Sequence, residues 1–119
     1  VHGYDGLDEI STTASTKISH LQENNTIEST AVSPADFGMV KASLEDLKGG
    51  EPDENAVIIK NILNNTDQGK KADIVILNAG AGIFIGGKSK TLKEGVEVAR
   101  ASIKSGAALE KLNQLAAVK

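Results

Sequence analysis

Apolar residues in the C-terminal half of the chain recur at the spacing of α-helices. Within residues 51–65 they fall every three or four positions, at Ala56, Ile59, Ile62 and Leu63. That spacing puts them on one face of a helix, where they can be buried together. Pro52 fits a first helical turn, and the acidic residues directly after it favour the positive end of the helix dipole. We therefore predict a helix that ends at Asn64-Asn65.

Two further helices are predicted after residue 90. TLKE at 91–94 has the capping-box pattern, in which a hydroxyl and a carboxylate satisfy the first free amides of a helix. Apolar residues line one face behind this box, at Leu92, Val96, Ala99 and Ile103. Gly106 interrupts the pattern, and a last helix is expected from the spacing of Leu109, Leu112 and Ala116.

The N-terminal half predicts strands and turns instead. Residues 16–22 and 26–32 contain β-favouring side chains, and ENN at 23–25 is a turn signal between them, so we expect a hairpin. PADFG at 34–38 predicts a short turn that Gly38 ends. SLED at 43–46 predicts a capped helical turn before Gly49-Gly50.

The run DIVILNAGAGIFIGG at 73–87 fits two structures. In one, DIVIL is a buried strand, and Gly80, Gly82 and Gly86 form a loop that approaches a dinucleotide pyrophosphate. The glycine spacing departs from the usual G-x-G-x-x-G, which weakens that interpretation. In the other, the run is a buried helix with Ile74, Leu77, Ala81, Phe84 and Lys88 on one face. We favour the helix, although each interior glycine costs about 0.8–1 kcal/mol relative to alanine.

Composition narrows the class of protein. A chain of 119 residues with 39% hydrophobic side chains is enough for one small domain with a single core. Aromatic residues make up only 3%, so the core is expected to be light and to rely on another piece for stability. No apolar run is long enough to span a membrane, and cysteine is absent, which agrees with a cytoplasmic protein. A net charge of −3 with dispersed basic residues argues against nucleic-acid binding.

The opening VHGYDGLDEIS concentrates acidic residues around a glycine that permits a sharp turn. Asp5, Asp8 and Glu9 offer hard oxygen ligands, and Mg²⁺ is usually held by one or two carboxylates together with waters and substrate phosphates. The alternative is a solvated acidic turn in which Asp5 or Ser11 caps backbone groups. His2 and His20 lack partner spacing, so we expect them to be structural or exposed rather than catalytic.

Several motifs in order resemble anthranilate phosphoribosyltransferases. VHGYDGLDEIS closely resembles that family's H-G-x-D-G-L-D-E stretch, and PADFGM its P-x-D-F-G turn. LEDLKGGEPDENAVIIKNIL and DIVILNAGAGIFIGGK are similar to the next two family segments, and LKEGVEVARASIKSGAALEKL to the last two helices. The family has alanines where this chain has Gly80 and Gly82, which suggests a weaker helix there. The resemblance covers nearly the whole chain.

The resemblance implies a fold of the α/β class. Residues 1–119 would be the C-terminal portion of the family's α/β catalytic domain, which is similar to nucleoside phosphorylases. That portion holds a β-hairpin and three to four C-terminal helices. The first part of the α/β domain and the helical N-terminal domain would be absent. In this family the helical domain forms a homodimer.

The resemblance also implies a reaction and a metal site. By this resemblance, Asp8 and Glu9 correspond to the family's Mg²⁺-binding acidic pair. The family's cofactor, Mg²⁺, bridges these carboxylates and the pyrophosphate of phosphoribosyl pyrophosphate (PRPP). The family transfers phosphoribosyl from PRPP to the amine of anthranilate in tryptophan biosynthesis, releasing pyrophosphate. No catalytic residue is assigned within this chain, and the anthranilate contacts and the glycine-rich pyrophosphate loop are missing. The chain alone is therefore expected to be inactive without a companion polypeptide.

Three alternatives stay open from the sequence. A pyrimidine nucleoside phosphorylase has the same fold, although the DGLDE stretch argues against it. A non-catalytic folding domain would bind Mg²⁺ only weakly. A dinucleotide-binding module at Gly80 and Gly82 would bind NAD.

Overall fold

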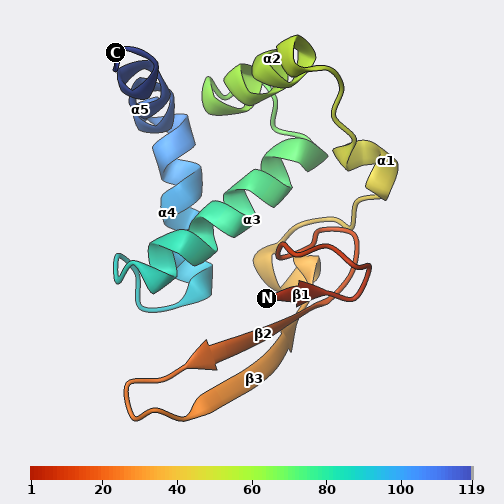
Figure 1. Ribbon diagram of the computed structural model, residues 1–119, viewed down its shortest axis with the longest axis vertical. Helices are drawn as coiled ribbons and strands as arrows, with labels where there is room; N and C mark the ends of the chain where they lie inside the picture. Colours follow the sequence, from red (N-terminus) through yellow and green to blue (C-terminus); the bar gives the residue numbers. More distant parts are fainter. Residues whose placement is uncertain (119) are drawn as a thin grey trace. The chain divides into compact units, whose positions relative to one another are not determined.

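The computed structural model describes residues 1–118, and the chain divides into two compact units (Figure 1). The first unit comprises Val1–Asp46, and the second begins at Leu47. Each unit has its own set of buried apolar residues, whereas the chain length had suggested a single core. The α/β class is confirmed, with strands in the first unit and four of the five described α-helices wholly in the second.

The first unit contains a three-stranded antiparallel sheet in the order β1-β2-β3. Its strands are β1 (His2–Gly3), β2 (Thr16–Leu21) and β3 (Ile27–Val32). The predicted hairpin is confirmed, with Thr16 opposite Val32 and Leu21 opposite Ile27. Asn25 takes the left-handed conformation that the turn requires, at φ 63°.

The core of the first unit lies under the loops rather than under the hairpin. Leu21 and Ile27 at the hairpin tip are 62% and 70% exposed. The buried apolar side chains come from the loop before β2 and the segment after β3, namely Ile10, Phe37, Met39 and Ala42. A short 3₁₀ helix, η1 (Pro34–Phe37), ends at Gly38 with φ 70°, which confirms the predicted turn. The Thr12 carbonyl accepts the Ala42 N–H at 2.9 Å and fastens this segment to the acidic loop.

The helices that the sequence predicted are present. They are α1 (Leu44–Leu47), α2 (Pro52–Leu63), α3 (Lys70–Ile85), α4 (Leu92–Lys104) and α5 (Ala107–Ala116). Thr91 caps α4 by accepting the Glu94 N–H at 3.1 Å, as the TLKE pattern indicated. None of the helices within residues 1–118 is both long and apolar enough to cross a membrane.

The ambiguous glycine run is helix α3. Gly80 and Gly82 lie inside it, so there is no glycine-rich loop there to bind a dinucleotide pyrophosphate. The predicted buried stripe was partly wrong: Leu77 is buried, but Phe84 is only half-buried and Lys88 is exposed beyond the helix end. The buried positions on α3 are Ala72, Ile76, Leu77 and Gly80.

The stripe predicted for α2 was also partly wrong. Ile62 is 3% exposed and buried as expected, but Ile59 is 49% exposed. Val57, which the pattern left outside the stripe, is 56% exposed, so apolar side chains of α2 meet solvent on more than one side.

A close backbone crossing joins α3 to α4. A Cβ atom placed on Gly80 would lie 2.7 Å from the backbone of Val96, and one placed on Gly95 would lie 2.3 Å from the Gly80 carbonyl oxygen. Real Cβ atoms do not approach so closely, so both positions need glycine for this packing. Gly82, in contrast, is exposed, and a Cβ there would meet nothing within 4 Å.

Alanine substitutions at two glycines of α3 should therefore have opposite effects on stability. Gly80→Ala should lower the free energy of unfolding by about 1–3 kcal/mol, because the added methyl group overpacks the crossing with α4. Gly82→Ala should raise it by about 0.5–1 kcal/mol, because it removes the helix cost of glycine with no clash. Urea unfolding followed by circular dichroism measures both variants under the same conditions. Stabilisation by both substitutions would contradict the close crossing.

Candidate acidic site

The acidic pair lies on the loop between β1 and β2. The side chains of Asp8 and Glu9 are exposed, whereas Ile10 directly after them is 1% exposed. Before the pair, the Gly3 N–H donates to the Leu7 carbonyl at 2.8 Å. The pair therefore stands out to solvent from a loop that is anchored on both sides.

Asp5 is the hydrogen-bonding centre of this loop. Its Oδ1 accepts the Leu7 N–H at 3.1 Å. Its Oδ2 accepts the hydroxyl groups of Ser11 and Thr13. Burial by itself would raise the pKa of Asp5, but these hydrogen bonds favour the ionised form, and the pKa lies below its ordinary value of 3.8. Asp5 is therefore an ionised acceptor that organises the loop.

The loop has no room for side chains at its tightest point. Gly3 is buried, and a Cβ there would lie 2.5 Å from Oδ1 of Asp5 and 3.0 Å from the Leu7 carbonyl. Gly6 takes φ 94°, in the left-handed region that glycine adopts without strain. The sharp turn expected around Gly6 is confirmed.

Buried hydroxyl groups support the C-terminal side of the loop. The Ser11 Oγ accepts the Thr13 N–H at 2.9 Å, and the Ser11 N–H donates to the Thr16 hydroxyl at 2.8 Å. Capping by Asp5 or Ser11 was the alternative that the sequence left open, and both side chains cap backbone amides. The roles of Thr13 and Thr16 were not predicted. The signal available for them was the run of hydroxyl residues that follows the acidic stretch. Thr12 Oγ1 is buried and has no hydrogen-bond partner within residues 1–118.

The donor set fits a magnesium ion that is only partly held by protein. Within the described chain, residues 1–118, no three His, Cys, Asp or Glu side chains come together to form a complete metal cluster. The loop offers two adjacent exposed carboxylates, Asp8 and Glu9. Mg²⁺ is usually bound by one or two carboxylates, while waters and substrate phosphates supply its other ligands. His2 is exposed, and His20 lies on β2 with its Nδ1 3.3 Å from Gln22 Nε2.

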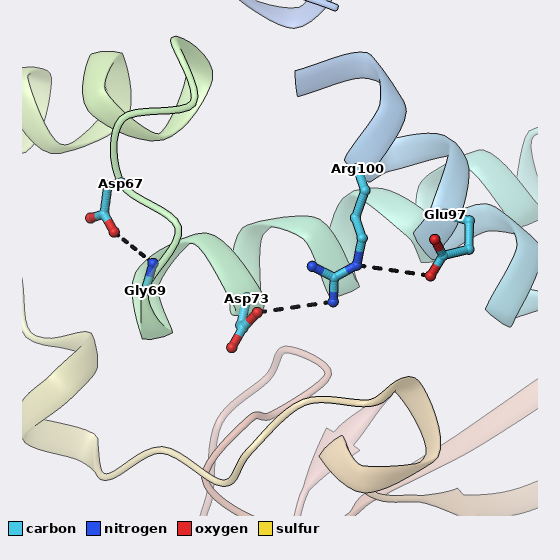
Figure 2. A network of polar contacts seen from close by, with 5 residues as sticks. All are labelled: Asp67, Gly69, Asp73, Glu97 and Arg100. Atoms are coloured by element: carbon cyan, nitrogen blue, oxygen red, sulfur yellow. Dashed lines mark hydrogen bonds and ion pairs between the residues drawn. The ribbon is translucent and has the colours of Figure 1, made fainter. Parts of the chain in front are cut away.

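A second polar cluster lies in the other unit, between α3 and α4 (Figure 2). Arg100 on α4 reaches Asp73 in the first turn of α3 at 4.0 Å and Glu97 at 3.8 Å. Asp67 accepts the Gly69 N–H at 2.8 Å, just before α3 begins. A hollow of about 370 Å³ includes Asp67, Asp73 and Arg100 in its lining. The residues that line this hollow all belong to the second unit.

Asp73 titrates differently from Asp5. Burial raises the pKa of Asp73 above its ordinary value, and the nearby charges of Arg100 and Lys70 oppose the shift without cancelling it. The ionised form of Asp73 is therefore less favourable in the folded protein than in the unfolded chain.

Comparison with known sequences points to one family. A family model described as "Glycosyl transferase family, a/b domain" matches residues 1–109. The anthranilate phosphoribosyltransferases of Thermoanaerobacter sp. and Desulfosudis oleivorans are 48% and 45% identical over 115 residues. These matches cover 97% of this chain but 33% and 34% of the relatives. The chain therefore spans about a third of the length of the curated relatives it matches.

Solved structures agree with the sequence matches. Anthranilate phosphoribosyltransferase from Thermus thermophilus has a TM-score of 0.83 and 36% identity, covering 92% of this chain and 32% of that one. The enzyme from Saccharomyces cerevisiae in complex with PRPP and Mg has a TM-score of 0.82 and 27% identity, covering 94% and 32%. The resemblance seen in the sequence and the fold class that it implied are both confirmed.

The stability contributed by Asp5 should depend on pH in a defined direction. Because its folded pKa is lowered, ionised Asp5 stabilises the fold above its unfolded pKa, and this contribution is lost as the pH falls through the folded value below 3.8. The difference in unfolding free energy between the wild type and Asp5→Asn should be largest above about pH 5. It should shrink as the pH falls below 3.8. Urea unfolding across a pH series measures this difference.

Asp73→Asn is the control, because the pKa of Asp73 is shifted in the opposite direction to that of Asp5. Its raised folded pKa means that the wild type should gain stability relative to this variant as the pH falls through that pKa. Parallel pH profiles for Asp5→Asn and Asp73→Asn would show that Asp5 is not stabilised as an anion.

Proposed function

The chain belongs to the glycosyl transferase family with this a/b domain, and on that premise we propose that it is part of an anthranilate phosphoribosyltransferase. Residues 1–119 form the C-terminal portion of the catalytic domain in this proposal. The whole enzyme transfers phosphoribosyl from PRPP to the amine of anthranilate, giving phosphoribosyl anthranilate and pyrophosphate. The observation that carries the proposal is the exposed Asp8-Glu9 pair on a hydrogen-bonded loop, in a chain 48% identical to such an enzyme.

In this proposal Asp8 and Glu9 hold Mg²⁺ against the substrate. Their carboxylates are exposed, and the loop beneath them is fixed by Asp5 and by buried hydroxyl groups. When bound, Mg²⁺ supplies positive charge that neutralises the departing pyrophosphate. Without a cation the two carboxylates would repel a pyrophosphate, because like charges at short range disfavour binding. The pair therefore couples substrate binding to the presence of a divalent cation.

The rest of the catalytic machinery is assigned to residues outside this chain. Contacts to anthranilate, a glycine-rich loop for the pyrophosphate, and the helical domain that forms a homodimer belong to the N-terminal part in this proposal. The product then enters tryptophan biosynthesis in the cytoplasm. This chain contributes the metal-binding loop and the helices α2 to α5.

Removing both carboxylates should greatly reduce turnover by the intact polypeptide. Asp8→Asn with Glu9→Gln keeps the size of each side chain but removes the negative charges that hold Mg²⁺. We expect kcat/KM for PRPP to fall at least about 100-fold. Mutating a residue that only orients a metal ligand already lowers metal affinity or activity by about 10–100-fold, and here the ligands themselves are removed. The loss of anthranilate fluorescence with PRPP and Mg²⁺ present measures the rate.

Glu23→Gln is the matched control, because Glu23 is an exposed carboxylate in the β2–β3 turn of the same unit. It should leave the rate within about twofold of the wild type, as surface substitutions usually do. Wild-type turnover by the Asp8→Asn, Glu9→Gln double variant would show that the acidic pair is not the metal site.

The 119-residue chain by itself should not catalyse the reaction. A site works only when its binding groups are all held in place, and the proposed anthranilate contacts lie outside this chain. The same fluorescence assay on the purified chain should show no signal loss, and adding the N-terminal part should restore a signal loss that a chelator abolishes. Steady turnover by the 119-residue chain alone would refute this division of the site.

A further inference from the structure

The carboxylate of Asp5 connects the two sides of the loop that carries Asp8 and Glu9. On the N-terminal side, Oδ1 accepts the Leu7 N–H at 3.1 Å. On the C-terminal side, Oδ2 accepts the hydroxyl group of Ser11. The acidic pair lies between these two attachment points. A segment whose two ends are held has far fewer conformations than a free loop.

The C-terminal attachment point is itself buried and hydrogen-bonded to the sheet. Ser11 is 1% exposed, and its N–H donates to the Thr16 hydroxyl at the start of β2. Thr13 is 8% exposed, and its hydroxyl also donates to Oδ2 of Asp5. Breaking the bond from Ser11 N–H to Thr16 would leave a buried amide without a partner, which costs about 1–3 kcal/mol. The sheet therefore holds Ser11, and Ser11 and Thr13 hold Asp5.

The three acidic side chains of the loop differ in what their oxygens are free to do. A carboxylate offers about four acceptor positions. On Asp5, three are taken by Leu7 N–H and the hydroxyls of Ser11 and Thr13. Asp8 and Glu9 are both exposed residues. Asp5 is therefore suited to hold the loop, and the other two are suited to bind a cation.

We propose that Asp5 is a positioning residue, which presents Asp8 and Glu9 as a preformed pair to a divalent cation. This proposal rests on the proposed function, in which those two side chains hold Mg²⁺. Without the Asp5 carboxylate, the loop must be ordered when the metal binds, and that ordering reduces affinity. Loss of a group that orients metal ligands typically weakens metal binding by about 10–100-fold.

Manganese binding to the intact polypeptide tests the proposal directly. Mn²⁺ alone is titrated, and electron paramagnetic resonance counts the free ion. Asp5→Asn should raise the Kd for Mn²⁺ about 10–100-fold. Thr13→Val, which removes one hydroxyl donor to Oδ2 at nearly constant shape, should raise it by a smaller factor. Ser19→Ala is the control, because Ser19 hydrogen-bonds Ser29 on the exposed hairpin, away from this loop.

The kinetics distinguish positioning from general loss of structure. High Mg²⁺ should restore most of the kcat of Asp5→Asn, with the Mg²⁺ concentration for half-maximal rate raised about 10–100-fold. It should not restore the Asp8→Asn, Glu9→Gln double variant. A purely structural role would instead lower kcat of Asp5→Asn at every Mg²⁺ concentration, and that result would overturn the proposal.

The two failures can be told apart. If the double variant loses Mn²⁺ binding but folded Asp5→Asn and Thr13→Val bind Mn²⁺ like the wild type, the positioning role of Asp5 is wrong and the metal site stands. If the double variant binds Mn²⁺ like the wild type, the metal assignment is wrong and the positioning role falls with it. Should circular dichroism find Asp5→Asn unfolded, the Thr13→Val result decides.

Discussion

The acidic loop depends on charge-assisted hydrogen bonds that converge on the Asp5 carboxylate. An ionised acceptor forms stronger hydrogen bonds than a neutral one, and here one acceptor draws in a backbone amide and two hydroxyl groups. Those bonds decide the path of the chain from Gly3 to Thr13. The close approach of Gly3 to Asp5 follows from the same arrangement, since a Cβ at that position would lie 2.5 Å from Oδ1. The path of the loop that carries Asp8 and Glu9 is therefore tied to the hydrogen bonds that the Asp5 carboxylate accepts.

The elements of the chain were predictable wherever local chemistry decides them. Helix α2 begins at Pro52 and α4 is capped by Thr91, both from signals within a few residues. The hairpin followed from β-favouring residues on both sides of a turn that puts Asn25 at positive φ. The family motifs added the order of these elements and the prediction that Asp8 and Glu9 are a metal-binding pair. Neither the local signals nor the family motifs required knowledge of contacts between residues far apart in the sequence.

The buried faces of the helices were less predictable, because they depend on partners far away in the sequence. Helix α3 is apolar on nearly every side, so its own periodicity does not single out one stripe. The crossing at Gly80 and Gly95 selects the face, since the two backbones approach there more closely than side chains allow. The glycines that suggested a weakened helix thus have different roles: Gly80 permits the crossing, and Gly82 faces solvent. Thr13 was not predicted for a similar reason, because its role is a hydrogen bond to Asp5, eight residues earlier in the chain.

In the proposed function, one motif contains acidic residues with two tasks that a single carboxylate cannot perform at the same time. A carboxylate that organises a loop needs donors on its oxygens, and each donor removes a position that a metal would use. A carboxylate that binds Mg²⁺ needs those positions open and directed to solvent or substrate. In the proposed function, different acidic residues of the motif perform the two tasks. Asp5 accepts the donors, whereas Asp8 and Glu9 are exposed beyond the turn at Gly6. The spacing between Asp5 and the pair is long enough for Gly6 to reverse the chain and short enough for one carboxylate to hold both sides of the loop. In the two proposals taken together, the conformation of the loop is therefore set before the metal binds, by a carboxylate whose oxygens already accept donors from the chain.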